Sequence, residues 1–479
     1  MTEAVIWMVV FGSFIVLLLL IYISKRRSKK SETIDETDEF KYIIDLIENS
    51  NKSIFISGRA GTGKSTLLRH LVNRRKKRYV VLAPTGVAAL NVKGQTIHSF
   101  FQLPPSLILK KDIQPNYAKH SIFSNIDTII LDEISMVRSD IMDGIDYALR
   151  VNRNRLNDPF GGVQMVFIGD LFQLPPVVTN DLQQYFLNTY GGRYFFNATV
   201  FHNEFNYQCK ELTINFRQKN DTGFQELLNR IRINQTTFDD YVNLNQRHVN
   251  NLGKQTEDAI ILTTNRKSVR TINKSRLIEI KSQEFTFDAI LSGTLKTKYD
   301  RLLNDFKNKR ISEEELDRRL ETNFPTDVEL KLKKGAQIIM IKNDRAKRWV
   351  NGSLGRILKI NNKGIWVKID SDTYKIEHEK WDDISYTYNQ QTKELSESSR
   401  GSFVQYPIKL AWALTVHKSQ GKTFDKVIID LAGGAFEHGQ TYVALSRCKT
   451  LAGITLNKEI GNNDVIVDPK IVNYYNEKM

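Results

Sequence analysis

One nine-residue stretch constrains the fold of this chain more than any other feature. Residues 58–66 read GRAGTGKST and match the pattern G-x-x-x-x-G-K-[ST]. The stretch follows an apolar segment at residues 53–57 and opens directly into a segment with helical spacing, which is the order that the pattern requires. Its glycines let backbone N–H groups surround phosphate oxygens, while Lys64 can reach the outer phosphates and Ser65 can ligate magnesium. The chain is therefore predicted to hold a phosphate chain on an α/β scaffold.

Two further strand ends supply polar groups that such a site needs. Apolar residues 128–131 lead to Asp132 and Glu133, at the edge of the sheet where α/β folds bind ligands. We expect Asp132 to hold magnesium through water and Glu133 to orient and deprotonate the attacking water. Residues 166–177, VFIGDLFQLPPV, repeat the arrangement, and the Gln173 amide can bond a terminal phosphate or that water. Taken singly, these segments also fit a solvated strand end and a proline-stiffened loop.

Short apolar runs alternate with helical stretches along the chain. A first set occupies residues 53–57, 79–83, 128–133 and 164–170, and a second set occupies residues 258–264, 408–415 and 426–431. This alternation predicts a parallel sheet covered by helices, and the second set predicts a second α/β lobe. Between them, residues 297–321 are highly charged with helical spacing. Residues from 333 to about 406 are rich in β-formers and turn signals, which predicts a small antiparallel barrel inserted in the second lobe.

The N-terminal residues 4–23 contain no ionisable side chain, and as a helix they would span roughly 30 Å, the thickness of a hydrocarbon core. Five basic residues follow directly, whereas Glu3 is the only charged side chain before the segment. The positive-inside rule therefore predicts a single-pass helix in the cell membrane, with the N-terminus outside and the remainder in the cytoplasm. The alternative is a buried core helix or a removed peptide. The net charge of +15 favours a polyanionic partner, either nucleic acid or an anionic membrane face.

Taken together, these motifs resemble those of the petite-integration-frequency (Pif) family of superfamily-one DNA helicases, of bacterial type and with an added transmembrane anchor. The resemblance extends from about residue 40 to 475. Beyond the segments above it includes APTGVAALNVKGQTIHSFF (83–101), LDEISMV (131–137), LTINFRQ (212–218), WVNGSLGRI (349–357), LTVHKSQGKTFD (414–425) and TYVALSRCK (441–449). Residues 150–170, RVNRNRLNDPFGGVQMVFIGD, resemble the signature stretch of this family.

The resemblance implies an α/β fold in which two RecA-like P-loop lobes with parallel sheets flank one ATP, with an SH3-like barrel inserted in the second lobe. The expected boundaries are an anchor with its basic flank at 1–30, a tether at 31–39, a first lobe at 40–205 with a wedge at about 102–123, a second lobe at 206–290 and 405–479, a charged helical insertion at 291–332 and the barrel at 333–404.

The resemblance also implies which residues act. The implied ATP contacts are Gly58, Ala60, Gly61, Thr62, Gly63, Lys64, Ser65 and Thr66, with Ser65 and Asp132 on magnesium. The implied catalytic residues are Lys64, Glu133, Gln173, Arg217 and Arg447, where the two arginines contact the γ-phosphate. The implied contacts to single-stranded DNA are Thr85 and His98 on the first lobe and Thr415, His417, Lys418, Ser419 and Gln420 on the second. Phe100 and Phe101 are instead predicted to pack in the core.

These features predict a membrane-tethered, ATP- and magnesium-dependent DNA helicase that works as a monomer. The resemblance alone implies 5′-to-3′ movement on single-stranded DNA, unwinding of duplex or structured DNA, and a role in repair, recombination or replication. Two alternatives stay open, a translocase without processive unwinding and a nucleotide-gated DNA tether. The segment TDEFKYII ahead of the phosphate loop lacks the Gln with which family members often recognise adenine, so base preference is also open.

Overall fold

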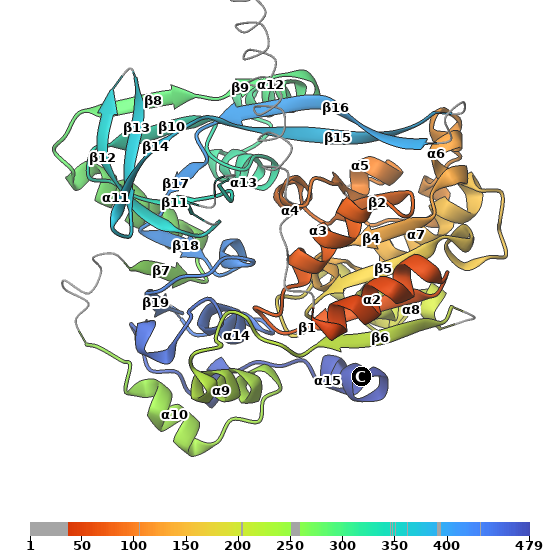
Figure 1. Ribbon diagram of the computed structural model, residues 1–479, viewed down its shortest axis with the longest axis horizontal. Helices are drawn as coiled ribbons and strands as arrows, with labels where there is room; N and C mark the ends of the chain where they lie inside the picture. The colour runs from red at the N-terminus through yellow and green to blue at the C-terminus, as the bar shows by residue number, and fades with distance from the viewer. Residues whose placement is uncertain are drawn as a thin grey trace, which may run out of the picture. The chain divides into compact units, whose positions relative to one another are not determined.

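The computed structural model of the protein describes residues 37–479, except residues 105, 203–204, 251–258, 345, 347, 350, 362, 390–393 and 432 and the side chains of 386–397. It forms two compact units, Met1–Asp45 and Leu46–Met479. Helix α2 (Asp38–Asn49) begins in the first unit, and every element below belongs to the second (Figure 1).

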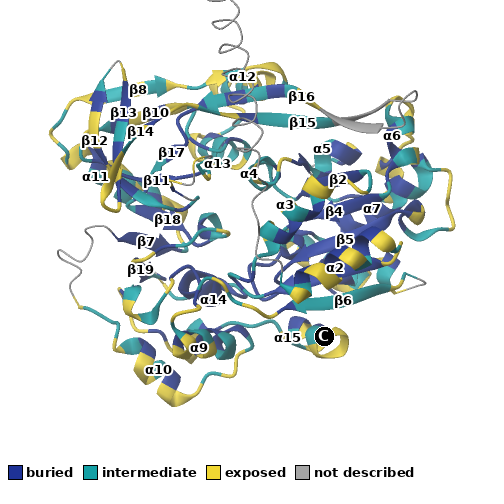
Figure 2. Ribbon diagram, in the orientation of Figure 1, coloured by how far each residue is buried: buried dark blue, intermediate teal, exposed yellow. Residues whose placement is uncertain are grey.

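Six parallel strands form the first sheet, in the order β3-β2-β4-β5-β1-β6. Strands β1, β4 and β5 are buried along their whole length, because helices cover both faces of a parallel sheet (Figure 2). The strands are β1 (Ser53–Gly58), β2 (Tyr79–Ala83), β3 (Gln95–Thr96), β4 (Thr128–Leu131), β5 (Gln164–Gly169) and β6 (Tyr207–Leu212). The helices of this part are α3 (Lys64–Arg74), α4 (Gly86–Asn91), α5 (Ile97–Phe101), α6 (His120–Asn125), α7 (Ser139–Asn152) and α8 (Asn180–Tyr190).

A second parallel sheet has four strands in the order β18-β7-β19-β20. The strands are β7 (Ile260–Thr263), β18 (Ala413–Thr415), β19 (Val427–Asp430) and β20 (Ile454–Leu456). The accompanying helices are α9 (Thr222–Arg232), α10 (Phe238–Asn245), α11 (Arg266–Glu279), α14 (Gln440–Leu445) and α15 (Pro469–Lys478). The two predicted α/β sheets are therefore both present. Strand β6 joins the first sheet, although the expected lobe boundary at residue 205 would place it in the second.

Helix α11, two further helices and three antiparallel sheets separate β7 from β18 in the described part of the chain. The two further helices are α12 (Gly293–Lys307) and α13 (Glu313–Asn323), within the predicted charged insertion. The strands are β8 (Glu284–Asp288), β9 (Ile290–Leu291), β10 (Glu329–Lys333), β11 (Gln337–Met340), β12 (Leu354–Asn361), β13 (Gly364–Ile369), β14 (Asp372–Ile376), β15 (Glu379–Asn389), β16 (Glu394–Gln405) and β17 (Ile408–Leu410).

Residues 333–404, for which a single barrel is expected, contribute strands to two separate antiparallel sheets. Strands β11 to β14 form a five-stranded antiparallel sheet with β17, which lies beyond the expected barrel. Strands β15 and β16 leave this sheet and pair with each other from Glu379↔Gln405 to Asn389↔Glu394, and β16 also pairs with β9.

The predicted fold class also included a transmembrane helix, and this part is corrected. Residues 4–23 lie outside the described residues. In the part of the chain that the structure describes, no helix has the length and apolar character needed to span a bilayer. The longest helix described there, α12, has 15 residues, whereas a span takes about 20. The fold class is thus an α/β fold with parallel sheets and no assigned membrane helix, and the predicted single-pass location in the cell membrane is withdrawn.

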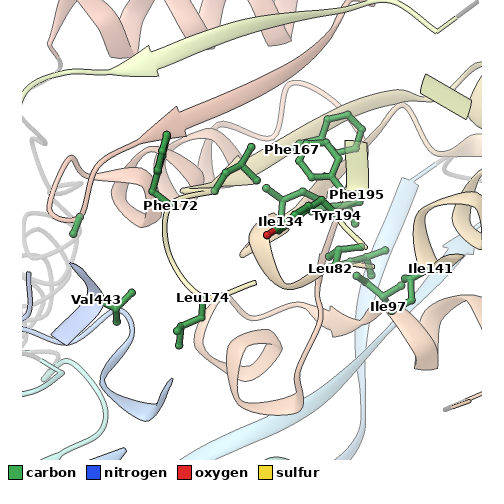
Figure 3. Close-up of a cluster of buried hydrophobic side chains, with 14 of the residues drawn as sticks. Leu82, Ile97, Ile134, Ile141, Phe167, Phe172, Leu174, Tyr194, Phe195 and Val443 are labelled. Atoms are coloured by element: carbon green, nitrogen blue, oxygen red, sulfur yellow. The ribbon is translucent and has the colours of Figure 1, made fainter. Parts of the chain in front are cut away.

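One hydrophobic cluster runs from the first sheet into the second half of the chain. Figure 3 shows part of it, with Phe167 and Leu174 from the first lobe and Val443 from α14. Phe100 and Phe101 belong to the same cluster, and their rings meet edge to face with centroids 4.9 Å apart. The prediction that these two aromatics pack in the core is confirmed.

Candidate nucleotide and nucleic-acid site

The phosphate loop connects β1 to α3 and ends at the first backbone N–H groups of this helix. Gly61 and Gly63 adopt positive φ angles of 91° and 85°, which residues with a Cβ atom rarely adopt. Helix α3 begins without a side-chain cap, so its first N–H groups have no side-chain acceptor and can bind an anion. The Lys64 ammonium donates to the carbonyl oxygens of Gly58 and Arg59, at 2.5 and 3.0 Å. Burial lowers the pKa of Lys64.

Asp132 and Glu133 follow β4 at the same sheet edge. The backbone N–H of Asp132 donates to Leu82 O at 2.9 Å, which ties the strand end to β2. Glu133 takes a left-handed conformation with φ of 50°, a strained state for a residue with a side chain that occurs often at functional sites. Burial, followed by the charge of Glu133, raises the pKa of Asp132, and burial also raises the pKa of Glu133. Lys64 opposes the shift of Glu133, which places its ammonium near this carboxylate.

Arg217 and Arg447 are brought together beside this loop. Arg217 Nη1 donates to Ser446 O at 2.9 Å, and Arg447 Nε donates to Val443 O at 2.9 Å. Burial, followed by Arg447, lowers the pKa of Arg217 to about 9. Among the described residues, neither guanidinium forms an ion pair with a carboxylate. Arg447 is thus buried and Arg217 half-buried, and the carboxylates of Glu133 and Asp170 balance the charge of Arg447 at longer range.

Gln173 connects the first lobe to a loop of the second. Its side chain is buried and its Nε2 lies 3.4 Å from Asp170 Oδ2. The Gln420 amide donates to Gln173 Oε1 at 3.5 Å, across the two lobes. A residue predicted to sense phosphate therefore contacts a residue predicted to bind DNA.

The residues predicted to contact DNA have different surroundings. Thr85 caps α4 by accepting from Ala88 N–H at 3.2 Å. Burial lowers the pKa of both His98 and His417, so both imidazoles are neutral near pH 7 and can accept or donate a hydrogen bond. Lys418 is already paired with Glu321 of α13.

Two predicted hydroxyl contacts are turned inward. The Thr415 hydroxyl accepts from Lys418 N–H at 3.2 Å, and the Ser419 hydroxyl donates to Val416 O at 2.7 Å. Both side chains are buried. In this arrangement the Ser419 carbonyl accepts from Arg447 Nη1 at 3.4 Å, which links the loop to the arginine pair.

A cavity of about 630 Å³ lies between the lobes on the side of His417. Val177 and Phe436 are 70% and 69% exposed at its wall. The lining residues are Pro175, Val177, Val178, Thr264, Asn265, Arg266, Thr415, His417, Gly433, Gly434, Phe436, Glu437 and Gln440. Its wall thus combines apolar side chains with hydroxyl, amide, imidazole and guanidinium groups.

Several site residues were missed from the sequence. Asn215 Oδ1 accepts from the N–H groups of Arg217 and Gln218, and Asn215 Nδ2 donates to Ala60 O at 3.2 Å. Gln218 Nε2 donates to Cys448 O at 2.8 Å. These residues sit in the same short motifs as the predicted arginines, which is the signal that could have indicated them.

A buried ion pair was also missed. Arg232 of α9 contacts Asp170 at 3.1 Å and Glu211 at 3.3 Å, and its guanidinium lies over the ring of Phe172. Arg232 and the neighbouring Lys64 help to lower the pKa of Asp170 against its burial. No sequence motif marks Arg232, because its partner is 62 residues away in the chain.

Comparison with known proteins identifies the family. A family profile described as "PIF1-like helicase" matches residues 33–241. The "ATP-dependent DNA helicase PIF1" of Emericella nidulans is 28% identical over 91% of this chain, and the "ATP-dependent DNA helicase Pif1" of Bdellovibrio bacteriovorus is 29% identical over 93% of this chain and 92% of its own length. The chain spans 62% of the length of the Emericella relative.

Solved structures of a Bacteroides Pif1 agree over nearly the whole of both chains. The complex with ADP-AlF4 is 34% identical, covers 92% of this chain and 96% of the other, and gives a TM-score of 0.81. The complex bound to ssDNA is 35% identical with the same coverage and a TM-score of 0.63. This chain therefore belongs to the PIF1-like helicase family.

Proposed function

We propose that this chain is an ATP-dependent DNA helicase that moves 5′-to-3′ on single-stranded DNA and unwinds duplex or structured DNA. The observation that carries the proposal is the pair of arginines beside the phosphate loop, Arg447 buried and Arg217 half-buried, neither of which has a carboxylate partner among the described residues. A buried charge is costly unless it is paired, and a phosphate chain in the loop would supply the missing negative charge. Because Arg447 follows α14 of the second lobe, its contact with ATP would make lobe closure depend on nucleotide.

The residues present fit magnesium as well as ATP. Ser65 offers an exposed hydroxyl and Asp132 a buried carboxylate, both of them oxygen ligands of the kind that magnesium prefers. Magnesium, when bound, would neutralise charge on the phosphates. Lys64 would exchange its loop carbonyls for phosphate oxygens. Glu133, whose pKa is raised by burial, suits a general base that accepts a proton from the attacking water, with the Gln173 amide orienting that water.

The proposed DNA path passes the cavity beside His417. Thr85 and His98 would serve it on the first lobe, and the loop from Thr415 to Gln420 on the second. Neutral imidazole and amide groups contact phosphates without reading bases, as movement along any sequence requires. The net charge of +15 supports a polyanionic partner. Lys418 would have to leave Glu321 to contact DNA.

We further propose that the described arrangement of lobes is the DNA-free one. The TM-score is 0.81 with the ADP-AlF4 complex of the Bacteroides protein and 0.63 with its ssDNA complex, although the coverage is the same and the sequence identities are 34% and 35%. The difference therefore lies in how parts of the fold are placed.

The lobe boundaries remain those expected, except that we propose to extend the first lobe to Leu212 so that it includes β6. We place the helicase in genome maintenance, which means repair, recombination or replication, acting as a monomer. This role is inferred from the DNA-helicase family.

ATP turnover with and without single-stranded DNA, followed by unwinding of duplexes with either a 5′ or a 3′ tail, tests the proposal. We expect DNA-stimulated hydrolysis and unwinding of the 5′-tailed duplex only. Hydrolysis without unwinding of either duplex would contradict the helicase assignment, and unwinding from the 3′ tail would contradict the polarity.

A further inference from the structure

The hydroxyl of Tyr442 lies between the phosphate loop and a buried carboxylate. The backbone N–H of Ala60 donates to Tyr442 Oη at 3.1 Å, and the same hydroxyl donates to Asp170 Oδ2 at 3.2 Å. The side chain is 4% exposed, so bulk water does not compete for either bond. Its burial, followed by the charge of Asp170, raises the pKa of Tyr442 and keeps the phenol protonated as a donor.

Both partners of Tyr442 are themselves fixed. Asp170 is held by the Arg232 guanidinium at 3.1 Å and by the backbone N–H of Phe172 at 3.2 Å. The carbonyl of Ala60 accepts from Asn215 Nδ2 at 3.2 Å. Tyr442 belongs to α14 but therefore joins two points of the first lobe that are each held by further hydrogen bonds.

Tyr442 also lies next to the residue that holds an arginine. Arg447 Nε donates to the carbonyl of Val443 at 2.9 Å. The Gln218 side chain bonds the backbone on both sides of Arg447, because its Nε2 donates to Ser446 O at 3.2 Å and to Cys448 O at 2.8 Å. A displacement of Tyr442 would move the Val443 carbonyl and, through it, the Arg447 guanidinium.

We propose that Tyr442 is a positioning residue that fixes where the Arg447 guanidinium lies relative to the phosphate loop. The hydroxyl fixes α14 against Ala60 and Asp170 at once, so loop conformation and arginine placement change together. The inference rests on the proposed ATP site, but none of the ATP or DNA contacts assigned above includes this side chain.

The test compares Tyr442→Phe with Tyr194→Phe. Tyr194 is an equally buried tyrosine whose hydroxyl donates to a carboxylate, Asp468 Oδ2 at 2.6 Å, but it does not contact the phosphate loop. Tyr442→Phe loses two buried hydrogen bonds and Tyr194→Phe loses one, so we expect small decreases in the thermal unfolding midpoint for both variants, the larger one for Tyr442→Phe. Only Tyr442→Phe should raise KM for ATP and lower kcat of DNA-stimulated hydrolysis, each by about tenfold, as expected for a hydrogen bond to a charged group.

A second experiment separates positioning from a general structural effect. In an Arg447→Lys background, Tyr442→Phe should cause no further loss of kcat, because the group it positions is already altered, while the rise in KM persists. Additive losses of kcat would overturn the proposal, as would KM and kcat values within twofold of the unmodified protein for Tyr442→Phe. If the unmodified protein hydrolyses no ATP, the proposed function itself fails, and this outcome is distinct from an unaffected Tyr442→Phe variant.

Discussion

When ionised, the buried carboxylates of Asp132 and Glu133 at the end of β4 lower the free energy of unfolding of the nucleotide-free protein. Burial raises the pKa of Asp132 and of Glu133, and the charge of Glu133 adds to the shift of Asp132. A carboxyl whose pKa is higher in the folded state binds its proton more tightly when folded. The free energy of unfolding therefore falls as pH rises from the unfolded value near 4 through the raised pKa.

This reasoning predicts that Asp132→Asn stabilises the nucleotide-free protein at pH 8, by about 1 kcal/mol or more, since each unit of pKa shift corresponds to 1.4 kcal/mol. The gain should shrink as the pH is lowered towards 4, where the native carboxyl is protonated. Thermal unfolding midpoints at several pH values measure it. A variant less stable than the unmodified protein at pH 8 would contradict the assignment of a buried, strained charge.

Glu133→Gln should separate ATP binding from hydrolysis. The amide keeps the size of the side chain but cannot accept the proton of the attacking water, so kcat should fall by about 10² to 10⁴. The affinity for an ATP analogue, measured by fluorescence titration, should stay within a few-fold. Glu314→Gln on the exposed face of α13 is the control and should hydrolyse ATP normally. Normal turnover by Glu133→Gln would mean that another group acts as the base.

At this scale, sequence motifs indicated residues whose spacing in the chain is short. Lys64 and Glu133 each follow a recognisable strand, so their position at one sheet edge could be inferred. Arg232 could not be found in this way, because its pairing with Asp170 depends on how α9 packs against the first sheet. The bond from the Ser419 hydroxyl to Val416 O could not be predicted either, because the sequence does not say which acceptor a serine hydroxyl will bond.

Among the elements, helix α15 connects the end of the chain to the first sheet. The ring of Tyr474 stacks on Phe196 with centroids 4.1 Å apart, and its hydroxyl lies 2.7 Å from the Tyr207 hydroxyl of β6. Tyr475 adds an edge-to-face contact with Phe172, next to the Arg232 ion pair. The helix thus covers the edge strand β6 and ties the second lobe to the first.

Tyr474→Ala should therefore lower the free energy of unfolding by about 3 to 5 kcal/mol, as expected for removal of a buried aromatic ring. Tyr474→Phe keeps the ring, loses the hydroxyl that bonds Tyr207 and Cys209, and should cost about 1 kcal/mol. Thermal or urea unfolding of both variants measures the difference. Equal stabilities would show that α15 contributes little to the packing of the first sheet.

Element prediction succeeded where a strand is buried on both faces, and was incomplete where the pairing of strands decides the arrangement. Strands β1, β4 and β5 are apolar throughout, so their sequences alone indicate a covered parallel sheet. The β-rich region beyond Lys333 carries turn signals, but these do not say which strand pairs with which. The sequence pattern is the same for a closed barrel and for a five-stranded sheet beside a long hairpin.

At the scale of the whole molecule, the two lobes share contacts that nucleotide and DNA would have to rearrange. Arg193 forms an ion pair with Glu437 at 2.7 Å, and His438 Nε2 lies 2.9 Å from Leu171 O. A third contact comes from strand β16, where Arg400 Nη2 donates to Ser99 Oγ of α5 at 2.9 Å, next to His98 in the chain. The contact of Arg400 joins the β15–β16 hairpin to α5, a segment proposed to bind DNA, so we expect DNA and the hairpin to compete for one surface.

This competition predicts that single-stranded DNA moves the inserted sheets relative to the first lobe. Fluorophores on cysteines at Gln184 of α8 and Lys368 of β13, both exposed, report the distance by energy transfer in a Cys209→Ser background. We expect a clear change on adding single-stranded DNA and a smaller one with an ATP analogue alone. A pair at Gln184 and Lys111, both in the first lobe, should not respond. Unchanged transfer at saturating DNA for the first pair would contradict a DNA-driven rearrangement, and the lower TM-score with the ssDNA complex would then reflect differences between the two proteins.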